Sequence, residues 1–289
     1  MTLAEKLPAE IVNFDSVQLC RGLDIGSAKP PLSARNRVPH HLIDCVDPNQ
    51  GLTAGAYSVL AHSVVEDIRG RGRVPVLVGG TGFYLRALLS GLPPAPIGNQ
   101  AIRERLGRLS KRRPAALHRY LARYDPPSAS RIHPNDHQKL IRAVELVLLS
   151  KRPASATLSL PRQMLRGFTI LKLGLSPDRA SLYTCLNLRT AQMFRSGLLE
   201  EAEALLNSGV SPDSKAMQSL GYQQAVKVLR NRISLEAAID ESQTKTRQYA
   251  KRQMTWFHKE PDVIWFNGFG HNPEIQLAAW MRIQQFLTE

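Results

Sequence analysis

Apolar residues in the first ninety positions alternate between short continuous runs and stripes with helical spacing. Runs at residues 10–14, 40–46 and 74–80 are typical of β-strands, and the last is nearly all apolar, as in a parallel strand covered on both faces. Residues 53–70 place their apolar positions on one helical face, and this helix is expected to end at Gly70. Strands separated by helices predict a parallel α/β sheet.

The pattern changes after residues 91–96, which read GLPPAP. From residue 99 to about residue 150 only helical spacing is found. One helix in this stretch carries an apolar stripe formed by Leu140, Ile141, Val144, Val147 and Leu148. Its opposite face carries Gln138, Arg142 and Glu145. We therefore predict a helical insertion in the α/β core.

Strand and helix signals both return over the rest of the chain. Residues 167–176 and 262–268 are typical of strands, and helices are expected over residues 181–206, over 223–229, from N-cap Ser234 to about His258, and up to Phe286. Three segments are predicted. The α/β core would have a first part at 1–95 and a second part, with a long basic C-terminal helix, at 166–289, and the basic helical insertion would occupy 96–165.

The charge distribution suggests a partner. The chain has a formal net charge of +14 and a pI near 10.1. Residues 101–166 hold fifteen Lys/Arg against four acidic residues, a net of +11, and residues 244–259 hold five more with no acid. Tyr249, Trp256 and Phe257 lie among the latter. A solvated basic face is the simpler interpretation, but two such segments favour a polyanion, and nucleic acid is the first candidate.

Several classes of protein are not indicated. No apolar run approaches the ~20 residues that a membrane-spanning helix needs, and the first ten residues contain acids in place of a signal pattern. Cys20, Cys45 and Cys185 are far apart and form no C-x-x-C pair, which favours free thiols in a reducing compartment. We expect a cytoplasmic monomer that makes no contact with a membrane.

Polar residues and glycines follow two of the predicted strands. Asp15 and Ser16 follow the first, and Gly79-Gly80-Thr81-Gly82 follows the third. Open α/β sheets bind ligands at the carboxyl ends of their strands. Asp15 could cap the next element or accept a proton from a substrate, and the residues alone leave both roles open. The glycine turn before a helix favours anions, but no Gly-Lys pair of the phosphate-binding loop occurs in the sequence.

Residues 40–47 could suggest a metal site, because they include His40, His41, Asp44 and Asp47. Adjacent histidines on a strand point to opposite faces, and no later segment supplies a matching cluster. A strand followed by a turn is the better interpretation, and we predict no metal-ligating side chains.

Longer motifs resemble one enzyme family. DSVQ with RGLDIGSAKP, HHLID, LVGGTGFYLRALLSGL, RIHPNDHQKLIRAVE, GLLEEAEALL, AMQSLGYQQ and TRQYAKRQMTWF occur in the order seen in bacterial tRNA dimethylallyltransferases, also called isopentenyl-tRNA transferases. The resemblance covers about residues 3–266. It implies transfer of a dimethylallyl group from dimethylallyl diphosphate to N6 of the adenosine 3′ of the anticodon in tRNA. It also implies a P-loop-type parallel sheet core, a helical insertion that binds the anticodon arm, and Mg²⁺.

The same resemblance implies roles for individual residues. Asp15 would be the general base that takes a proton from the N6 amine, and Thr81 would donate to the oxygen that bridges the allyl carbon and the leaving diphosphate. Arg189 would face the diphosphate. The residues expected to contact tRNA are Asp15, Ser16, Val17, Gln18, Thr81, Arg103, Gln138, Lys139, Leu140, Ile141 and Arg142.

The sequence departs from the family pattern on the diphosphate side. The family opens with a strand and a G-x-T-x-S-G-K-[ST] loop, and neither occurs in the sequence. Leu3, Leu7 and Ile11 have helical spacing, so we expect the chain to start inside the helix that comes after this loop. Cys185 stands where the family has an arginine.

Three interpretations remain open. The chain could be a transferase whose recorded start is too late or that is truncated. It could be a decayed homologue that binds tRNA without catalysis. It could be a small-molecule adenylate dimethylallyltransferase or a nucleotide kinase, although this leaves the basic insertion without a purpose.

Overall fold

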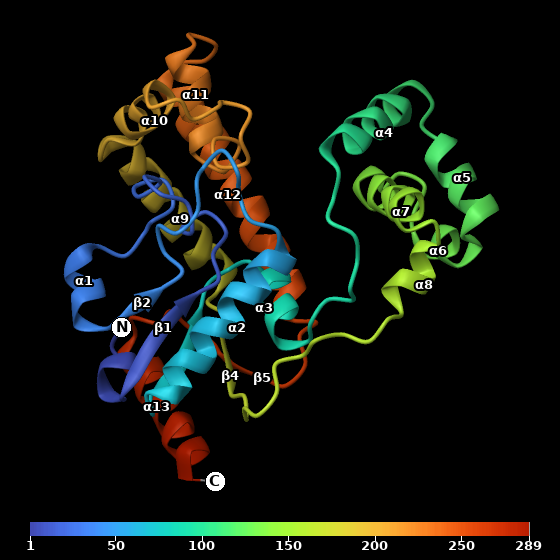
Figure 1. Ribbon diagram of the computed structural model, residues 1–289. Helices are drawn as coiled ribbons and strands as arrows, with labels where there is room; N and C mark the ends of the chain where they lie inside the picture. The colour runs from blue at the N-terminus through green and yellow to red at the C-terminus, as the bar shows by residue number, and fades with distance from the viewer. Residues whose placement is uncertain (289) are drawn as a thin grey trace. The chain divides into compact units, whose positions relative to one another are not determined.

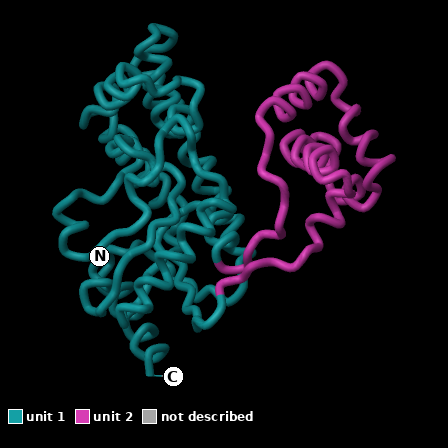
Figure 2. The backbone as a smooth tube through the Cα atoms, in the orientation of Figure 1, with its two compact units in different colours: residues 1–88, 166–289 teal, residues 89–165 magenta. Residues whose placement is uncertain are grey.

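The chain forms two compact units in the computed structural model, which describes residues 1–288 (Figure 2). Unit 1 comprises Met1–Leu88 and Arg166–Glu289, and unit 2 comprises Leu89–Leu165. Unit 2 begins upstream of the boundary that the sequence suggested at residue 96, because its two connecting segments are joined to each other. The Leu165 N–H donates to the Leu89 carbonyl at 3.3 Å.

Unit 1 contains the strands of the protein and most of its helices (Figure 1). Among the described residues its strands are β1 (Ala9–Asn13), β2 (His40–His41), β3 (Val74–Val78), β4 (Lys172–Leu175) and β5 (Val263–Phe266). Its helices are α1 (Leu32–Arg37), α2 (Ala54–Gly70), α3 (Gly82–Leu89), α9 (Arg179–Arg195), α10 (Leu198–Asn207), α11 (Tyr222–Leu229), α12 (Leu235–Phe257) and α13 (Pro273–Thr288). Thus the predicted mixture of parallel strands and helices is confirmed.

The strands form two separate parallel sheets. One has the order β2-β1-β3 and the other pairs β4 with β5. β1 is buried along its whole length, and α2 lies against it with Tyr57, Ala61 and Ile68 fully covered. In the register of β1 and β3, Asn13 is paired with Val78, so these two strands end side by side.

β3 differs from the prediction that both of its faces are covered. Four of its residues are only half-buried, and Val78 is 50% exposed. The physical reason is that β3 pairs only with β1 and β4 pairs only with β5, so each leaves one edge without a strand partner among the described residues. β3 therefore ends a sheet here, where its apolar sequence led us to expect a strand covered on both faces.

The predicted strand over residues 40–46 is mostly wrong. Only His40 and His41 pair with β1, and an isolated bridge joins Cys20 to Val46. Leu42 and Asp44 have φ angles of 59° and 54°, in the left-handed region, which a strand cannot include. This segment is therefore a constrained loop after a very short strand.

The helix expected through Leu3, Leu7 and Ile11 is also wrong. Residues Ala4–Lys6 form a single 3₁₀ turn, and Leu7 is already extended. Pro8 explains the break, because a proline disfavours the helical conformation of the residue before it. Ile11 belongs to β1 and is buried against Ala9 and Val38.

The main core of unit 1 lies among helices α9 to α12. Leu198, Met217 and Tyr222 are fully buried there, and Leu23 from the first part of the chain joins them. Glu201 of α10 accepts hydrogen bonds from three consecutive backbone N–H groups, those of Asp24, Ile25 and Gly26. The loop after β1 is thereby fixed to the second half of the chain.

Unit 2 is entirely helical in its described residues. It contains α4 (Gln100–Arg112), α5 (Ala116–Tyr124), α6 (Pro126–Arg131), α7 (His137–Ser150) and α8 (Ala154–Leu158). Its core includes Leu117, Leu121 and Leu140, which are almost fully buried. In addition, Asp125 is fully buried, caps α6 and accepts from the Ser155 hydroxyl at 2.6 Å.

Glu145, which the helical pattern placed on the exposed polar face of α7, is instead fully buried. It accepts from Arg103 Nε at 2.9 Å, from Arg142 at 2.5 Å and from the Asn99 backbone N–H at 2.6 Å. Burial alone would raise the pKa of Glu145, but the bonds from both arginines outweigh it and hold this pKa below its ordinary value. Glu145 thus joins α4, α7 and the segment that enters unit 2.

No described helix is both long and apolar enough to cross a membrane.

We predict that Glu145→Gln lowers the free energy of unfolding by about 2 kcal/mol at neutral pH, because it removes the charged acceptor and keeps the shape. A carboxylate with a lowered pKa stabilises the fold above its ordinary pKa, and this contribution is lost as the pH falls through the lower folded value. The difference from the wild type should therefore shrink below about pH 4. Urea unfolding at several pH values measures it.

Glu104→Gln is the matched control. Glu104 is exposed on α4 and accepts only from Gln100 at 3.0 Å, so its replacement should change stability little. Equal losses in the two variants, or a Glu145→Gln effect that is unchanged at low pH, would contradict this assignment.

Candidate active site and nucleic-acid interface

The ends of β1 and β3 bring the residues after each strand together. The Phe14 N–H donates to the Val78 carbonyl at 2.9 Å, and the Thr81 N–H donates to the Phe14 carbonyl at 3.3 Å. The Asp15–Gln18 turn and the glycine turn therefore leave the same edge of the sheet in contact with each other. This is the carboxyl edge, where parallel α/β sheets bind their ligands.

The two oxygens of Asp15 have different surroundings. Oδ1 accepts from the Val17 N–H at 2.8 Å and from the Gln18 N–H at 3.3 Å. Oδ2 faces Gly80, where an added Cβ would lie 3.9 Å away. Oδ1 thus fills the capping role, although the next residues form a series of turns rather than a helix, and Oδ2 is left to face the glycine turn. The capping role and the proton-acceptor role are compatible, one on each oxygen.

Thr81 is joined to the same turn by its hydroxyl. Its Oγ1 accepts from the Ser16 N–H at 3.0 Å and donates to Ser16 Oγ at 3.2 Å. A hydroxyl proton can rotate to a new acceptor at little cost. Thr81 can therefore redirect its proton to a ligand oxygen while it keeps the bond from Ser16.

The glycines of the turn allow close approach by two other parts of the chain, the end of β1 and helix α12. A Cβ on Gly79 would lie 2.6 Å from the Phe14 carbonyl carbon and 2.8 Å from the Asp15 nitrogen. A Cβ on Gly80 would overlap Gln253, and one on Gly82 would overlap the Trp256 ring. The sequence suggested that this glycine turn binds an anion. In the structure the turn packs closely against the end of β1 and against α12.

Helix α12 adds Gln253 and Tyr249 to the site; the sequence analysis noted Tyr249 only as an aromatic residue among basic ones and did not single out Gln253. Gln253 Nε2 donates to the Gly80 carbonyl at 2.9 Å. Burial, and then the negative charge of Asp15, raise the pKa of the Tyr249 phenol, while Thr81 and Gln253 lower it. Tyr249 therefore stays neutral beside Asp15. The only sequence signal was that both residues fall in TRQYAKRQMTWF, at helical spacing from one another.

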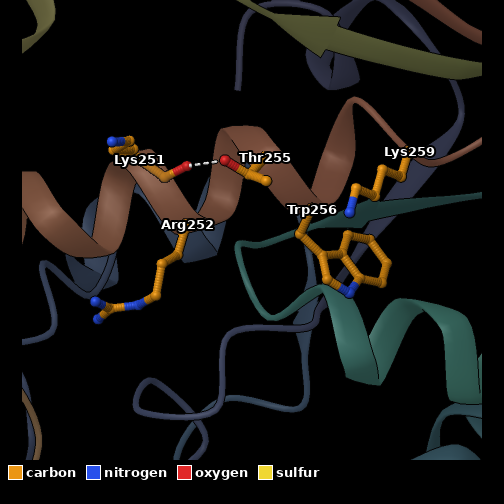
Figure 3. Close-up of a pocket in the computed structure, with 5 residues that line it drawn as sticks. All are labelled: Lys251, Arg252, Thr255, Trp256 and Lys259. Carbon is orange, nitrogen blue, oxygen red and sulfur yellow. Dashed lines mark hydrogen bonds between the residues drawn. The ribbon is translucent and has the colours of Figure 1, made fainter. Parts of the chain in front are cut away.

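The same helix carries a basic hollow of about 290 Å³ lined by Lys251, Arg252, Thr255, Trp256 and Lys259 (Figure 3). Its three cations form no ion pair among the described residues. In contrast, Lys245, which the sequence suggested was uncompensated, pairs with Glu241 at 2.7 Å. These three cations thus lie at and just beyond the C-terminal end of α12, where Trp256 packs against the glycine turn.

Unit 2 holds six of the residues that the sequence analysis assigned to tRNA, from Arg103 to Arg142, and the other five lie in unit 1. Arg103 and Arg142 share Glu145, and their side chains are 39% and 37% exposed. Gln138 and Lys139 are exposed on α7, and Ile141 is half-buried. Leu140 is fully buried in the core of unit 2, so its side chain does not lie on the surface, and its assignment to tRNA stays a prediction.

Most other cations of unit 2 are exposed and unpaired. No ion pair within residues 1–288 includes the arginines and lysines at positions 105, 108, 111, 112, 113, 119, 123, 131, 151, 152 and 162. Such a surface attracts polyanions over about one Debye length, near 10 Å at 0.1 M salt.

Arg189 is exposed on α9, four residues after the exposed Cys185. No hydrogen bond or ion pair of the described residues joins Arg189 to Asp15 or Thr81. Its assignment to a diphosphate therefore stays a prediction.

The histidines and aspartates of residues 40–47 form other interactions. His41 contacts Glu10 at 2.6 Å, and Asp44 pairs with Lys29 at 2.5 Å. Among the described residues, no group of three or more His, Cys, Asp or Glu could hold a metal ion.

Taken together, these features define an α/β enzyme-like fold with a carboxylate and a hydroxyl at the carboxyl edge of a parallel sheet, and with cationic surfaces on α12 and on a helical unit. Comparisons with known proteins agree with this class. The model of the family described as IPP transferase matches residues 18–260, and the chain belongs to that family.

Curated relatives cover nearly the whole chain. It is 48% identical over 289 residues to the tRNA dimethylallyltransferase of Solibacter usitatus, a match that covers 100% of this chain and 94% of that relative. It is 47% identical over 276 residues to the enzyme of the same name from Koribacter versatilis, with 95% and 90% covered.

Solved structures have the same fold. The tRNA isopentenylpyrophosphate transferase of Bacillus halodurans is 33% identical with a TM-score of 0.69, and the match covers 99% of this chain and 89% of that one. A eukaryotic dimethylallyltransferase, described as acting on tRNA, is 26% identical with a TM-score of 0.80, and 99% and 75% are covered.

We predict that Gly82→Ala displaces Trp256 and destabilises the protein by about 1–3 kcal/mol, the usual effect of overpacking. The indole is rigid and Arg86 lies over it at 4.4 Å, so it has little room to move. Thermal unfolding and Trp fluorescence would measure the change.

Gly107→Ala provides the control, because an added Cβ there meets nothing within 4 Å. It lies inside α4, where alanine should stabilise the helix by about 0.5–1 kcal/mol. A destabilising effect in both variants, or in neither, would show that close packing on Gly82 is unimportant.

Proposed function

We propose that this protein transfers a dimethylallyl group from dimethylallyl diphosphate to N6 of the adenosine 3′ of the anticodon in tRNA. The observation that carries the proposal is the contact between the Asp15 turn and Thr81 at one edge of a parallel sheet. The names of relatives at 48% and 47% identity support it.

Asp15 would act as the general base through Oδ2. An exocyclic amine is a weak nucleophile, and removing its proton as the C–N bond forms lowers the barrier. The amine nitrogen bonds to the allyl carbon, the carbon–oxygen bond to the diphosphate breaks, and Asp15 receives the proton. The bonds to Oδ1 from Val17 and Gln18 keep the carboxylate in one orientation during this step.

Thr81 would assist departure of the diphosphate. Negative charge develops on the oxygen that bridges the allyl carbon and the leaving group, and a positioned hydroxyl stabilises it. The bond from the Ser16 N–H holds Oγ1 in place while its proton turns from Ser16 Oγ to the donor.

Two basic surfaces would bind the tRNA. Ser16, Val17 and Gln18 follow the general base Asp15 in the chain. The hollow on α12 offers three unpaired cations beside the indole of Trp256. On unit 2 the exposed residues Gln138, Lys139 and Ile141, with Arg103 and Arg142, would contact the anticodon arm. The target base would leave its stack to reach Asp15, as for other enzymes that modify a base.

Mg²⁺ would accompany the donor. The described residues provide no cluster that holds a metal by itself. However, Mg²⁺ is commonly bound by one or two carboxylates together with substrate phosphates and water. We infer that the ion is held mainly by the diphosphate, and that Arg189 supplies positive charge on that side.

A second candidate is a tRNA-binding protein without transfer. One observation favours it: the hydrogen bonds of Asp15 Oδ1 and of Thr81 Oγ1 already give both residues a structural role in the turn. β3 and β4 each have one free edge, and this agrees with a P-loop-type core in which one further strand lies between them.

We further propose that the protein acts in the cytoplasm as a monomer.

Incubation of the purified chain with tRNA, dimethylallyl diphosphate and Mg²⁺, followed by mass spectrometry of the nucleosides, separates the two candidates. Transfer predicts N6-dimethylallyladenosine. Tight tRNA binding with no product would favour the second candidate. The absence of both tRNA binding and product would contradict both candidates.

For an active preparation, we predict that Asp15→Asn lowers the rate of transfer by roughly 10²–10⁴-fold, the range for a general base. Thr81→Ala should lower it on the order of 10²-fold, as for one transition-state donor. Single-turnover assays at saturating tRNA would measure both rates. Near-normal turnover of Asp15→Asn would leave Asp15 only its capping role.

We also predict that Arg108→Gln with Arg112→Gln weakens tRNA binding and reduces its salt dependence by one to two units in log–log slope, since each phosphate contact contributes about 0.9 for a duplex. Both arginines are exposed on α4 without an ion pair. Filter binding over a range of salt concentrations measures the slope.

The control removes two exposed arginines from unit 1 that already have acidic partners, Arg37 beside Glu5 and Arg69 beside Glu66. Their replacement by glutamine should leave the slope almost unchanged. An equal effect of the two double variants would mean that only net charge matters.

A further inference from the structure

Asn13, the last residue of β1, has a buried amide whose hydrogen bonds converge on Asp15. Asn13 as a whole residue is only 4% exposed. Oδ1 accepts from the Asp15 N–H at 3.0 Å, and Nδ2 donates to the Asp15 carbonyl at 3.3 Å. One side chain therefore holds the peptide groups on both sides of the Asp15 Cα.

The same amide is anchored from the opposite side. Nδ2 also donates to the Leu42 carbonyl at 2.9 Å, and Leu42 has a φ of 59°, an unfavourable conformation for a branched residue. In addition, the main-chain carbonyl of Asn13 accepts from the hydroxyl of Tyr57, which is fully buried. Strained residues persist where surrounding contacts fix them, and they gather at functional sites.

An amide suits this position because it combines an acceptor and a donor. The Asp15 N–H requires an acceptor and the Leu42 carbonyl requires a donor, so the two ends of the amide cannot be exchanged. A carboxylate would lack the donor, and an apolar residue of similar size would leave buried polar groups unpaired.

We propose that Asn13 is a positioning residue for the general base. By fixing the backbone of Asp15 it keeps Oδ1 on the Val17 N–H and turns Oδ2 toward the glycine turn. This rests on the proposed function in one respect only, namely that Asp15 is the base. No described contact of Asn13 involves Thr81, Gln253 or the basic residues, so its effect passes through Asp15 and Leu42.

Two substitutions separate positioning from stability. A serine hydroxyl at this position can accept the Asp15 N–H, as in the short local bonds that serine forms in turns, but it is too short to donate to Leu42. Asn13→Ala loses all three side-chain bonds, those to the Asp15 N–H, the Asp15 carbonyl and the Leu42 carbonyl. If stability alone matters, the serine and alanine variants should behave alike, since both lose the bond to Leu42. If the placement of Asp15 matters, the serine variant should keep the transfer activity that the alanine variant loses.

We expect Asn13→Ala to lower kcat on the order of 10–10²-fold, the effect of a small misplacement of a catalytic group, with the KM for tRNA unchanged. Asn13→Ser should remain within a few-fold of the wild type, and the melting temperatures of the two variants should be similar. Equal losses of kcat in both variants, or full activity of Asn13→Ala, would overturn the proposal.

Amide hydrogen exchange provides a readout that needs no turnover. The Asp15 and Val17 N–H groups are bonded to Asn13 Oδ1 and to Asp15 Oδ1 respectively. Both should exchange faster in Asn13→Ala and at near wild-type rates in Asn13→Ser. Unchanged exchange in Asn13→Ala would overturn the proposal even if the wild type transfers nothing, whereas a wild type without product but with the expected exchange pattern would contradict only the proposed function.

Discussion

The close approach of Gly79 to the backbone of Phe14 and Asp15 is the constraint on which the site depends. Two parallel strands end in register, and the missing side chain of Gly79 allows the segments after them to stay in contact beyond the sheet. Because of this contact, Thr81 reaches the Ser16 N–H and Asp15 Oδ2 faces the glycine turn. Gly80 and Gly82 extend the same principle to α12, which contributes Gln253 and Trp256 from nearly the other end of the chain.

Charge is used in two distinct ways in the two units. Ion pairs with one buried member hold segments together: the buried Glu145 joins Arg103 to Arg142, and Lys29, whose side chain is 1% exposed, joins Asp24 to Asp44. The remaining cations on unit 2 and at the end of α12 are left without acidic partners. The net positive charge therefore reflects a surplus directed outward, after the structural pairs have been formed. This is the arrangement expected of a protein that binds a polyanion and releases counterions.

Much of the fold could be predicted from periodicity, because β1, α2, β3 and the long helix α12 each have one strong pattern. The errors have local physical causes. Pro8 ended a helix that Leu3 and Leu7 suggested, and the positive φ angles of Leu42 and Asp44 ended a strand that only the apolar residues indicated. Glu145 was placed on the wrong face because a helical wheel cannot show that two distant arginines converge on it. Asp15 and Thr81 could be proposed from motifs, whereas Asn13, Tyr249 and Gln253 depend on contacts that no spacing reveals.

Asp15 Oδ2 is the atom that we expect to meet the amine of the target adenosine, and the proposed chemistry depends on this contact. A structure of the complex with tRNA and an unreactive analogue of dimethylallyl diphosphate would test it most directly. We predict a flipped adenosine whose N6 lies about 3 Å from Asp15 Oδ2, with Oδ1 still bonded to the Val17 N–H. An adenosine N6 held by another side chain, with Asp15 Oδ2 turned away from it, would contradict this role of Asp15.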